Sequence, residues 1–518
     1  MASRLEQPAL AEFDQAPSQP RLGSLTWKKP TAWWIMFLAP FNVIVESAIF
    51  SAQVGLYGDL VCRFRQEVLA PEAPCASDPE VQIIVTKLIS VIVTTTGVLS
   101  LLTTGWWGSF TDRRGRRVML GIGASGYLAL CVNTLLVINF SNWLPGGYWF
   151  LVMNGILHGI VGGSAAENTA MLAYLSDVSN LSRIFSAAFG CLVIGIGIGP
   201  MLASLLIRYT QSVSVVFYVA TGIKLVYTLT VWFILPESST PGQREEAKAK
   251  YEAFQTTNAG IHWAKRLLVP IEPLLIILPR KQPGTNKRSW DLFLLVLADG
   301  LALMVIASII FQFLYTVVAF GWTAEYIGYC YSTLNFAKAI YLLSVLPLGI
   351  RYLNSRSERA HVSSETQSLL AARPAPSSIV VDFKIVRLSV LADLATFLLL
   401  PLAPNGKVFI AAIAFGALGS AIAPVVRSVA LELYTKSLGE GEPVESGKLL
   451  GALSILQALF GSIIGPAFYG AVYAATVATF PRAIFLVGIA NCVLSLTLLS
   501  FVKLGSKPVH SRAYIDRH

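Results

Sequence analysis

The sequence predicts an all-α membrane protein with twelve transmembrane helices in two pseudo-symmetric six-helix halves. Three observations predict it: the composition, the number of long apolar runs, and short motifs that recur between the two halves of the chain. Of the 518 residues, 54% are hydrophobic and only 13% are charged, whereas a soluble domain carries about 25% charged residues. We therefore expect the lipid bilayer to be the solvent of this chain.

Twelve apolar runs are long enough to form spanning helices, because a helix needs about 20 residues to cross roughly 30 Å of hydrocarbon. They lie near residues 31–56, 83–107, 118–139, 147–173, 185–208, 212–235, 292–317, 326–350, 385–402, 407–431, 449–475 and 482–502. A charged segment with several prolines follows the sixth run and divides the chain in two. We expect a cytosolic N-terminal tail at 1–30, a six-helix half at 31–235, a cytosolic linker with an interfacial amphipathic helix at 236–290, a second half at 291–503 and a cytosolic tail at 504–518.

The basic residues lie in alternate connections between the runs. They gather at 113–117, 248–288, 351–359 and 503–517, whereas the connections at 140–146 and 476–480 contain no Lys or Arg. This is the positive-inside pattern, so both termini are expected in the cytosol, and the net charge of +10 does not indicate nucleic-acid binding. Either the plasma membrane or a vacuole-like membrane fits the pattern.

The expected loop after the first helix lies on the non-cytosolic side and contains Cys62 and Cys75. A disulfide between them can persist on an oxidising side, with Cys330 as an alternative partner. The sequence contains no H-E-x-x-H, G-x-S-x-G or Walker A motif. We therefore expect no enzyme activity, no bound metal or cofactor, and no ATP-driven pumping.

The halves share short motifs at corresponding positions. GIGIGP at 195–200 recurs as GSIIGP at 461–466, and GSAA at 163–166 recurs as GSAI at 419–422. Glycines four residues apart let a neighbouring backbone approach closely, and a following proline bends the helix. The positions expected to serve packing or bending are Gly195, Gly199, Pro200, Gly461, Gly465 and Pro466. Plain tight packing and a moving gate are both open readings.

Polar and ionisable residues inside the runs are candidates for a substrate or proton pathway, because such groups are costly in hydrocarbon and face a cavity or a partner. They are Asn42, Glu46, Gln53, Asn154, His158, Glu167, Asn168, Lys224, Asp299, Gln312, Asn335, Lys338, Asp393, Arg427 and Gln457. The two lysines lie near the centres of their runs, so each needs an acidic partner.

Two groups of these candidates share a helix face. Asn42, Glu46 and Gln53 lie on a stripe about 40° wide, and Glu46 is expected to carry a proton near mid-membrane or to form a structural hydrogen bond. In the fourth run, Asn154, His158 and Asn168 form a second stripe, with Glu167 displaced from it. His158 can exchange a proton near neutral pH or simply pack with a hydrogen bond.

A charged turn between the second and third runs reads GSFTDRRGRRVML at 108–120. It resembles the loop signature G-x-x-x-D-(R/K)-x-G-(R/K)-(R/K) of the major facilitator superfamily of secondary transporters, and this resemblance covers the whole chain. It implies the major facilitator fold and a cytosolic gate whose charges exchange partners between two arrangements. The gate residues are Gly108, Asp112, Arg113, Gly115, Arg116, Arg117, Asp177 and Arg183.

Further stretches resemble the branch that contains the proton-coupled folate transporter, namely 108–120, AYLSDVS at 173–179, and 473–488 at the last helix. The long segments at 236–290 and 351–381 depart from that branch, and the seventh run lacks the histidine that the branch uses for proton coupling. The glycines and proline at 195–200 resemble instead a signature of drug–proton antiporters.

These features predict a monomeric, proton-coupled secondary transporter of a small organic solute. It is expected to work by alternating access, with one half rocking against the other around a site between helices 1, 4, 7 and 10. An exporter that exchanges a drug or metabolite for protons is the alternative. A transport-inactive receptor or scaffold is a third hypothesis, which the retained charges inside the membrane disfavour.

Overall fold

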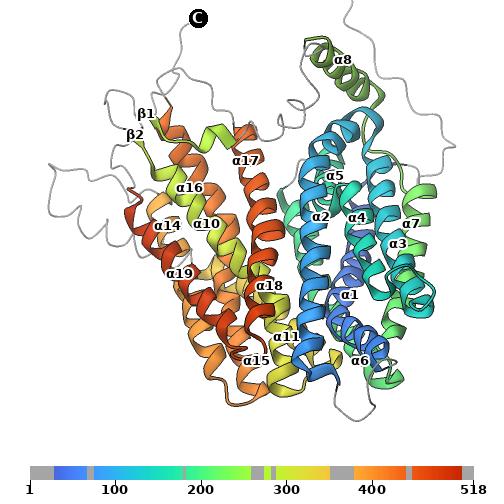
Figure 1. Ribbon diagram of the computed structural model, residues 1–518. Coiled ribbons are helices and arrows are strands. Elements are labelled where there is room, and N and C mark those ends of the chain that lie inside the picture. Colours follow the sequence, from blue (N-terminus) through green and yellow to red (C-terminus); the bar gives the residue numbers. More distant parts are fainter. Residues whose placement is uncertain are drawn as a thin grey trace, which may run out of the picture.

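The computed structural model describes residues 29–66, 75–178, 182–257, 274–281, 288–349, 378–438 and 446–503. Its helices form two groups that lie side by side, coloured blue to green and yellow to red in Figure 1. Eleven helices of this described part are long and apolar enough to cross a membrane. The all-α fold in two halves, expected from the sequence, is therefore confirmed.

The first half consists of α1 (Ala32–Gln66), α2 (Pro79–Arg114), α3 (Arg116–Phe140), η3, α4 and α5 (Gly147–Leu151, Val152–Ile160 and Gly163–Val178), α6 (Ser182–Thr210) and α7 (Ser214–Phe233). The second consists of α10 and α11 (Asp291–Ala307 and Ile309–Phe320), α12 and η5 (Ala324–Ile340 and Tyr341–Val345), α14 and η6 (Ser378–Leu399 and Leu400–Leu402), α15, η7 and α16 (Gly406–Phe415, Gly416–Ala421 and Ile422–Ser437), α17, η8 and α18 (Ser446–Ala458, Leu459–Ile464 and Gly465–Thr476), and α19 (Ala483–Phe501). The predicted eighth span corresponds to α12 and η5. It is not among the eleven apolar helices, but α12 packs along α6 in the bundle.

The segment between the halves contains structure that the sequence patterns did not predict. Helix α8 (Pro241–Thr257) packs on α2, and β1 (Arg280–Lys281) pairs antiparallel with β2 (Arg288–Ser289). Most of the expected amphipathic helix, and both tails apart from residues 29 and 30, lie outside the described residues. We call the end of the bundle that carries α8 and the α2–α3 turn the linker end, and the opposite end, which carries Cys62 and Cys75, the disulfide end.

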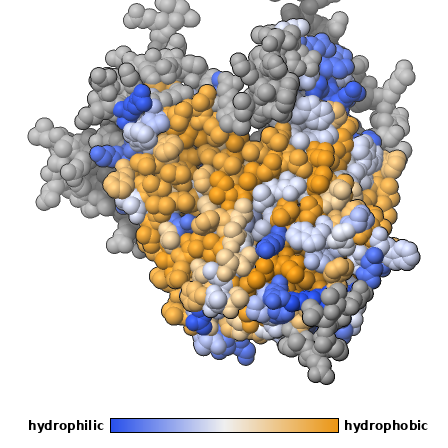
Figure 2. All heavy atoms as spheres, in the orientation of Figure 1, coloured by the Kyte–Doolittle hydropathy of each residue, from blue (hydrophilic) through white to orange (hydrophobic). Residues whose placement is uncertain are grey.

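The outer surface of the bundle is largely apolar, as the orange area in Figure 2 shows. Trp33, Phe233 and Leu402 each expose more than 70% of their surface. A soluble monomer rarely leaves apolar patches of this extent open to water. The surface therefore suits contact with lipid chains, in an integral membrane protein that crosses the bilayer many times.

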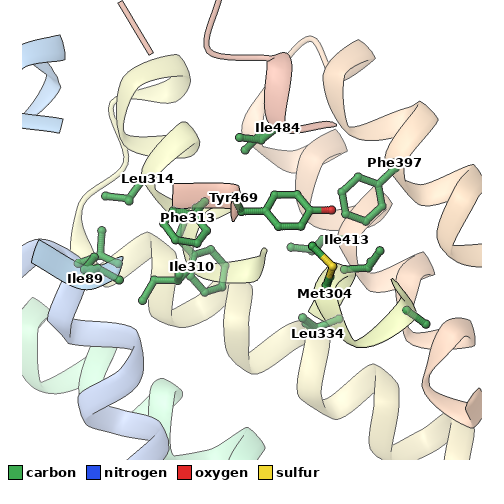
Figure 3. Close-up of a cluster of buried hydrophobic side chains, with 14 of the residues drawn as sticks. Ile89, Met304, Ile310, Phe313, Leu314, Leu334, Phe397, Ile413, Tyr469 and Ile484 are labelled. Atoms are coloured by element: carbon green, nitrogen blue, oxygen red, sulfur yellow. The ribbon is translucent and has the colours of Figure 1, made fainter. Parts of the chain in front are cut away.

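Inside the bundle, buried side chains join the two halves near the disulfide end. Figure 3 shows Ile89 of α2 beside Ile310 and Phe313 of the second half, in a cluster that continues to Tyr469 and Phe397. The Tyr469 hydroxyl accepts a hydrogen bond of 3.0 Å from the Asn491 amide, so its polar end is satisfied within the apolar surroundings.

The fourth span is broken between α4 and α5, where Gly162 and Gly163 have φ angles of 87° and 58°. Only glycine adopts such angles without steric cost. The carbonyl oxygens freed by the break accept hydrogen bonds from α2: Ser100 Oγ donates to Gly162 O at 2.7 Å and Trp107 Nε1 donates to Ile160 O at 2.8 Å. Such partners are required because lipid cannot satisfy an exposed carbonyl.

The repeated glycines do not all serve close packing. A Cβ atom at Gly195 would lie 3.2 Å from the backbone oxygen of Pro40, and one at Gly199 would collide with the Ile44 carbonyl and the Ser47 hydroxyl, so α6 lies directly on α1 at both positions. In the second half, a Cβ at Gly465 would lie 2.7 Å from that of Ala307. Of the two roles expected for Gly461, close packing is wrong, because it lies in the π-helical η8 and no described atom lies within 4 Å of an added Cβ.

Pro200 continues α6 without ending it, whereas Pro466 occupies one of the first two positions of α18, immediately after η8. The helix is continuous from α17 through η8 into α18, so Pro466 lies where the π-helical turn gives way to the α-helix. The repeated motif therefore produces different local structures in the two halves, because only the second copy follows a π-helical turn.

At the disulfide end, Cys62 of α1 is bonded to Cys75, with their Cα atoms 5.9 Å apart. Cys330, the alternative partner, is a buried free thiol. Arg65 reinforces the connection because its guanidinium lies 3.1 Å from Asp78 and also pairs with Glu80. The start of α2 is thereby fixed against the end of α1.

Replacing both Cys62 and Cys75 with serine is expected to lower the free energy of unfolding by up to about 3 kcal/mol, the value for closing a loop of about 15 residues. Thermal unfolding in detergent measures the change. A reducing agent should reproduce it in the wild type but not in the double variant, and Cys191→Ser serves as the control. A wild-type melting temperature that is insensitive to reduction would contradict the stabilising role.

Candidate functional site

Polar side chains from three helices meet inside the first half. Asn42 and Glu46 of α1, Glu167 of α5 and Lys224 of α7 form what we call the acid–lysine cluster. The Lys224 side chain is fully buried; its Nζ donates a hydrogen bond to Asn42 Oδ1 and lies 3.5 Å from Glu46 Oε1. Asn42 Nδ2 also donates to Glu46 Oε1 at 2.9 Å. Because Asn42 and Glu46 are four residues apart on α1, their side chains lie on one face and both contact the Lys224 ammonium.

Two aromatic rings complete the surroundings of the Lys224 ammonium. It lies 4.3 Å from the ring centroid of Tyr127 in α3 and 5.2 Å from that of Tyr227 in α7. Cation–π attraction of this kind compensates part of the cost of burying a charge. Sequence reasoning missed both tyrosines, although Tyr227 follows Lys224 by three residues and so had to share its face.

The charges of the cluster do not balance when every group is ionised. Lys224 and Glu46 form a pair, and the Glu46 side chain is still 26% exposed. Glu167 is buried and interacts electrostatically with both Glu46 and Lys224, and one of its carboxyl oxygens has no hydrogen-bond partner among the described residues. Since an unpaired buried charge is expensive, one proton added to the carboxyl pair makes the cluster neutral. Glu167, rather than the Lys224-paired Glu46, is the carboxyl that lacks compensation.

The space beside the cluster is small. A cavity of about 30 Å³ is lined by Asn42, Glu46, Glu167 and Asn168 among otherwise mainly apolar side chains. Such a volume holds about one water molecule. In this conformation the cluster has room for a proton carrier such as water, but none for an organic solute.

A second set of charges lies in the second half. Asp299 of α10 interacts electrostatically with Arg427 of α16, and one of its carboxyl oxygens is buried with no hydrogen-bond partner in the part of the chain that the structure describes. Arg427 is exposed at the surface of its helix and donates a hydrogen bond of 3.2 Å to Gln457 of α17. An exposed guanidinium next to a carboxyl group that has a free hydrogen-bond acceptor can bind a polar solute group.

Lys338 of α12 and Asp393 of α14 form a third charged group. They interact electrostatically, and Asp393 packs against the backbone of Gly419 in η7. Each basic residue of the three groups is therefore near an acid. Lys224 lies with Glu46 and Glu167, Lys338 with Asp393, and Arg427 with Asp299.

Other residues predicted to line the pathway lie apart from the three charged groups described above. Asn154 is buried in hydrogen bonds to Asn133 and Thr134. Gln312 donates to Ser308 at the break between α10 and α11, and Asn335 donates to the Tyr331 carbonyl one turn earlier. These amides satisfy polar groups close to them.

The expected stripe of Asn154, His158 and Asn168 was wrong. It assumed one continuous helix, whereas the chain breaks at Gly162 and Gly163, which resets the faces of α5. His158 packs edge-on against Tyr127 with the ring centroids 5.4 Å apart, and Asn168 lies at the small cavity. Gln53, further along α1, is half-buried and not part of the cavity wall.

At the linker end, Arg116 binds two acids at once. Its Nε lies 3.2 Å from Asp177 of α5, and its Nη1 pairs with Asp112 of α2. Asp177 is 12% exposed and Asp112 is 56% exposed, so the first pair is the better shielded from water. Arg113 instead stacks on Tyr251 of α8, 3.5 Å from the ring centroid. The side chain of Arg183 lies outside the described residues, and Gly108 faces open space.

The sharp turn between α2 and α3 is held by a residue that sequence reasoning missed. Glu237, just after α7, accepts hydrogen bonds from the backbone N–H groups of Arg116 (2.8 Å) and Arg117 (3.1 Å). A carboxylate at a helix N-terminus accepts hydrogen bonds from the unpaired N–H groups there, and its negative charge interacts favourably with the helix dipole. Gly115 has a φ of 114° and leaves no room for a Cβ beside this carboxylate. The run PESST at 236–240 was the available signal.

Comparisons with known proteins agree with this architecture. The sequence profile described as Major Facilitator Superfamily matches residues 24–359. An uncharacterized membrane protein of Schizosaccharomyces pombe is 24% identical over 80% of this chain and 70% of its own length. The MFS-type transporter avaJ of Aspergillus versicolor is 22% identical over 90% of this chain and 88% of its own. A solved structure, the nucleoside transporter NupG, superposes with a TM-score of 0.57 at 12% identity, over 91% of this chain and all of that one, which shows likeness of fold.

Proposed function

The chain belongs to the major facilitator superfamily, and from this membership we propose that it carries a small organic solute across the membrane. A proton gradient drives this transport. The two halves alternate in access around a solute site between them. The acid–lysine cluster carries the coupling proton, and the set of Asp299, Arg427 and Gln457 contributes polar contacts to the solute.

One observation carries the proton assignment: two carboxyls face a single buried ammonium. With Lys224 and Glu46 paired, the buried carboxyl of Glu167 has no ion pair of its own among the described residues. A proton bound there neutralises the cluster, and its loss restores a charge that only water or movement of Lys224 can stabilise. The nearby cavity of about 30 Å³ admits water but excludes the solute.

The proposed orientation places the linker end in the cytosol, because α8 and the basic α2–α3 turn lie there. The disulfide at the other end suits an oxidising, non-cytosolic side of a plasma membrane or a vacuole-like compartment. We propose a monomer as the working unit.

Solute–proton antiport is the second candidate, and one contact favours it. The face of α6 that carries Gly195 and Gly199 lies on the α1 segment from Pro40 to Ser47. That segment contains Asn42 and Glu46. Bending of α6 at Pro200 would therefore be transmitted directly to the acid–lysine cluster, as an exporter controlled by this motif requires.

Purified protein in lipid vesicles with an imposed pH gradient tests the proposal. The solute panel includes folates and cationic drugs, in keeping with the two sequence resemblances. Solute that accumulates in the direction of proton flow establishes symport, and solute that moves against it establishes antiport. Transport that proceeds equally with and without the gradient would overturn proton coupling in either form.

At the linker end, we propose that Arg116 with Asp177 and Asp112 controls turnover rather than solute binding. Asp177→Asn should slow turnover about tenfold, because it removes the shielded half of the pair, and Asp112→Asn should slow it less. Neither change should alter the solute concentration for half-maximal rate by more than about twofold. Initial rates in vesicles measure both constants, and a large loss of apparent affinity at normal turnover would contradict the assignment.

A further inference from the structure

A groove between α2 and α18 is separate from the charged groups already described. It has a volume of about 790 Å³ and opens at the surface of the bundle. One wall is the α2 face from Ile83 to Thr95, and the other is the α18 face from Ala467 to Ala475. Pockets that bind ligands of drug size have volumes of about 300–1,000 Å³. The groove is therefore large enough for a bound molecule.

The two walls differ in chemistry. The α18 wall consists of small residues, Gly470 and four alanines, which leave space, whereas the α2 wall presents Lys87, Ser90, Thr94 and Thr95. In Figure 2, white and blue residues interrupt the orange surface over this pair of helices. A strip of polar side chains in an otherwise apolar surface indicates that the groove binds an amphiphilic molecule.

Lys87 gives the groove a charge that calls for a counter-ion. Its side chain is exposed, and the structure shows neither an ion pair nor a hydrogen bond for it among the described residues. It lies eight residues from the start of α2 at Pro79, or about 12 Å along the helix axis. Because α2 is longer than the hydrocarbon is thick, this depth corresponds to the headgroup boundary at the disulfide end.

The deeper part of the groove spans most of one lipid leaflet. From Lys87 to Thr95 the α2 wall extends about 12 Å, against about 15 Å for half of the hydrocarbon. The Thr94 hydroxyl lies about two turns below Lys87, is buried, and has no hydrogen-bond partner in the described structure. At that depth the groove lies beside acyl chains rather than headgroups, and the alanines of α18 leave room for one chain.

We propose that this groove binds one anionic phospholipid of the leaflet at the disulfide end, with its phosphate on Lys87 and an acyl chain along α18. Each half supplies one wall, and Ser90 of α2 already touches Gly470 of α18. A lipid in this groove bridges the halves, and so stabilises the arrangement in which α2 and α18 pack together.

Photolabelling of the full chain in nanodiscs tests the proposal. The nanodiscs contain phosphatidylcholine with a small fraction of phosphatidylglycerol that carries a photoreactive group in its acyl chain, and labelled positions are mapped by mass spectrometry. Wild-type protein should be labelled on both walls, at 83–95 and 467–475. Lys87→Glu should lower this labelling about tenfold, because it replaces a charge-assisted contact by repulsion, whereas Lys87→Arg should retain it.

Lys407 provides the matched control, because it is an exposed lysine at the start of α15, at the same end of the bundle, and is no part of the groove. Lys407→Glu should leave the labelling unchanged. Labelling of α19 by the same probe reports that each variant is folded and embedded. Equal labelling of wild type and Lys87→Glu, equal labelling by a photoreactive phosphatidylcholine, or label confined to α2 would each overturn the proposal.

Discussion

Replacing Glu167 with glutamine is expected to abolish the accumulation of solute against its gradient while leaving exchange of solute across the membrane intact. Glutamine mimics the protonated carboxyl, so the cluster stays neutral through the whole cycle and no proton is released. Coupling of one proton per solute supports about tenfold accumulation per pH unit of gradient. The variant should bring this ratio to about 1.

Glu46→Gln is also expected to abolish accumulation, but for another reason. Lys224 loses its paired acid, and Glu167 must stay ionised to compensate the buried ammonium. The protein should still reach the membrane. The matched control is Glu246→Gln in α8, where the acid is exposed and pairs with Lys250 of the same helix. Undiminished accumulation in both the Glu46 and the Glu167 variants would exclude the cluster from coupling.

Gly199→Ala is expected to destabilise the protein by about 1–3 kcal/mol, the cost of forcing extra volume into a packed interior. The added methyl group would collide with the Ile44 carbonyl and the Ser47 hydroxyl of α1. A backbone carbonyl cannot rotate away as a side chain can. The helices α1 and α6 must therefore separate, which would also move Glu46. Thermal unfolding followed by size-exclusion chromatography measures the effect.

Gly222→Ala in α7 is the matched control, because nothing lies within 4 Å of a Cβ at that position. It should be neutral or stabilising by up to about 1 kcal/mol, the gain from replacing a helical glycine with alanine. Adding Ser47→Ala to Gly199→Ala should recover part of the lost stability by removing one of the two colliding groups. Equal melting temperatures for Gly199→Ala and Gly222→Ala would contradict the close contact.

The architecture could be predicted from sequence because hydrophobic length and charge distribution are properties of contiguous segments. Each apolar run corresponds to a helical segment, and the basic turn at 108–120 lies between α2 and α3 as expected. The spacing of Asn42 and Glu46 likewise placed two members of the acid–lysine cluster on one face, since α1 is continuous there.

The rest of the cluster could not be predicted by spacing. The pattern put Glu167 beside the stripe of Asn154, His158 and Asn168 because it assumed one continuous helix. The helical phase is instead interrupted at Gly162, and the hydrogen bonds that permit this break come from α2, distant in sequence. Which acid pairs with Lys224 depends on the packing of α7 against α1 and α3, and a pattern within one helix carries no such information.

Features outside the apolar runs were the least predictable. Helix α8 is polar and packs on α2, where Arg113 stacks on Tyr251, so no long apolar run marks it in the sequence. Glu237 accepts a hydrogen bond from the backbone of the turn between α2 and α3, although it lies more than a hundred residues later in the sequence. Gly461 repeats the spacing of Gly195 but not its contact, because η8 rotates the helix face locally.

The most direct test of the account measures proton movement in vesicles whose internal and external pH are equal at the start. Solute is added outside, and a trapped dye reports the internal pH as the solute enters. We expect the wild type to shift the internal pH, downward for symport or upward for antiport. In vesicles preloaded with unlabelled solute, Glu167→Gln should exchange labelled solute without any shift. Solute entry without a pH change in the wild type, or an undiminished change in Glu167→Gln, would contradict the claim that the acid–lysine cluster couples transport to protons.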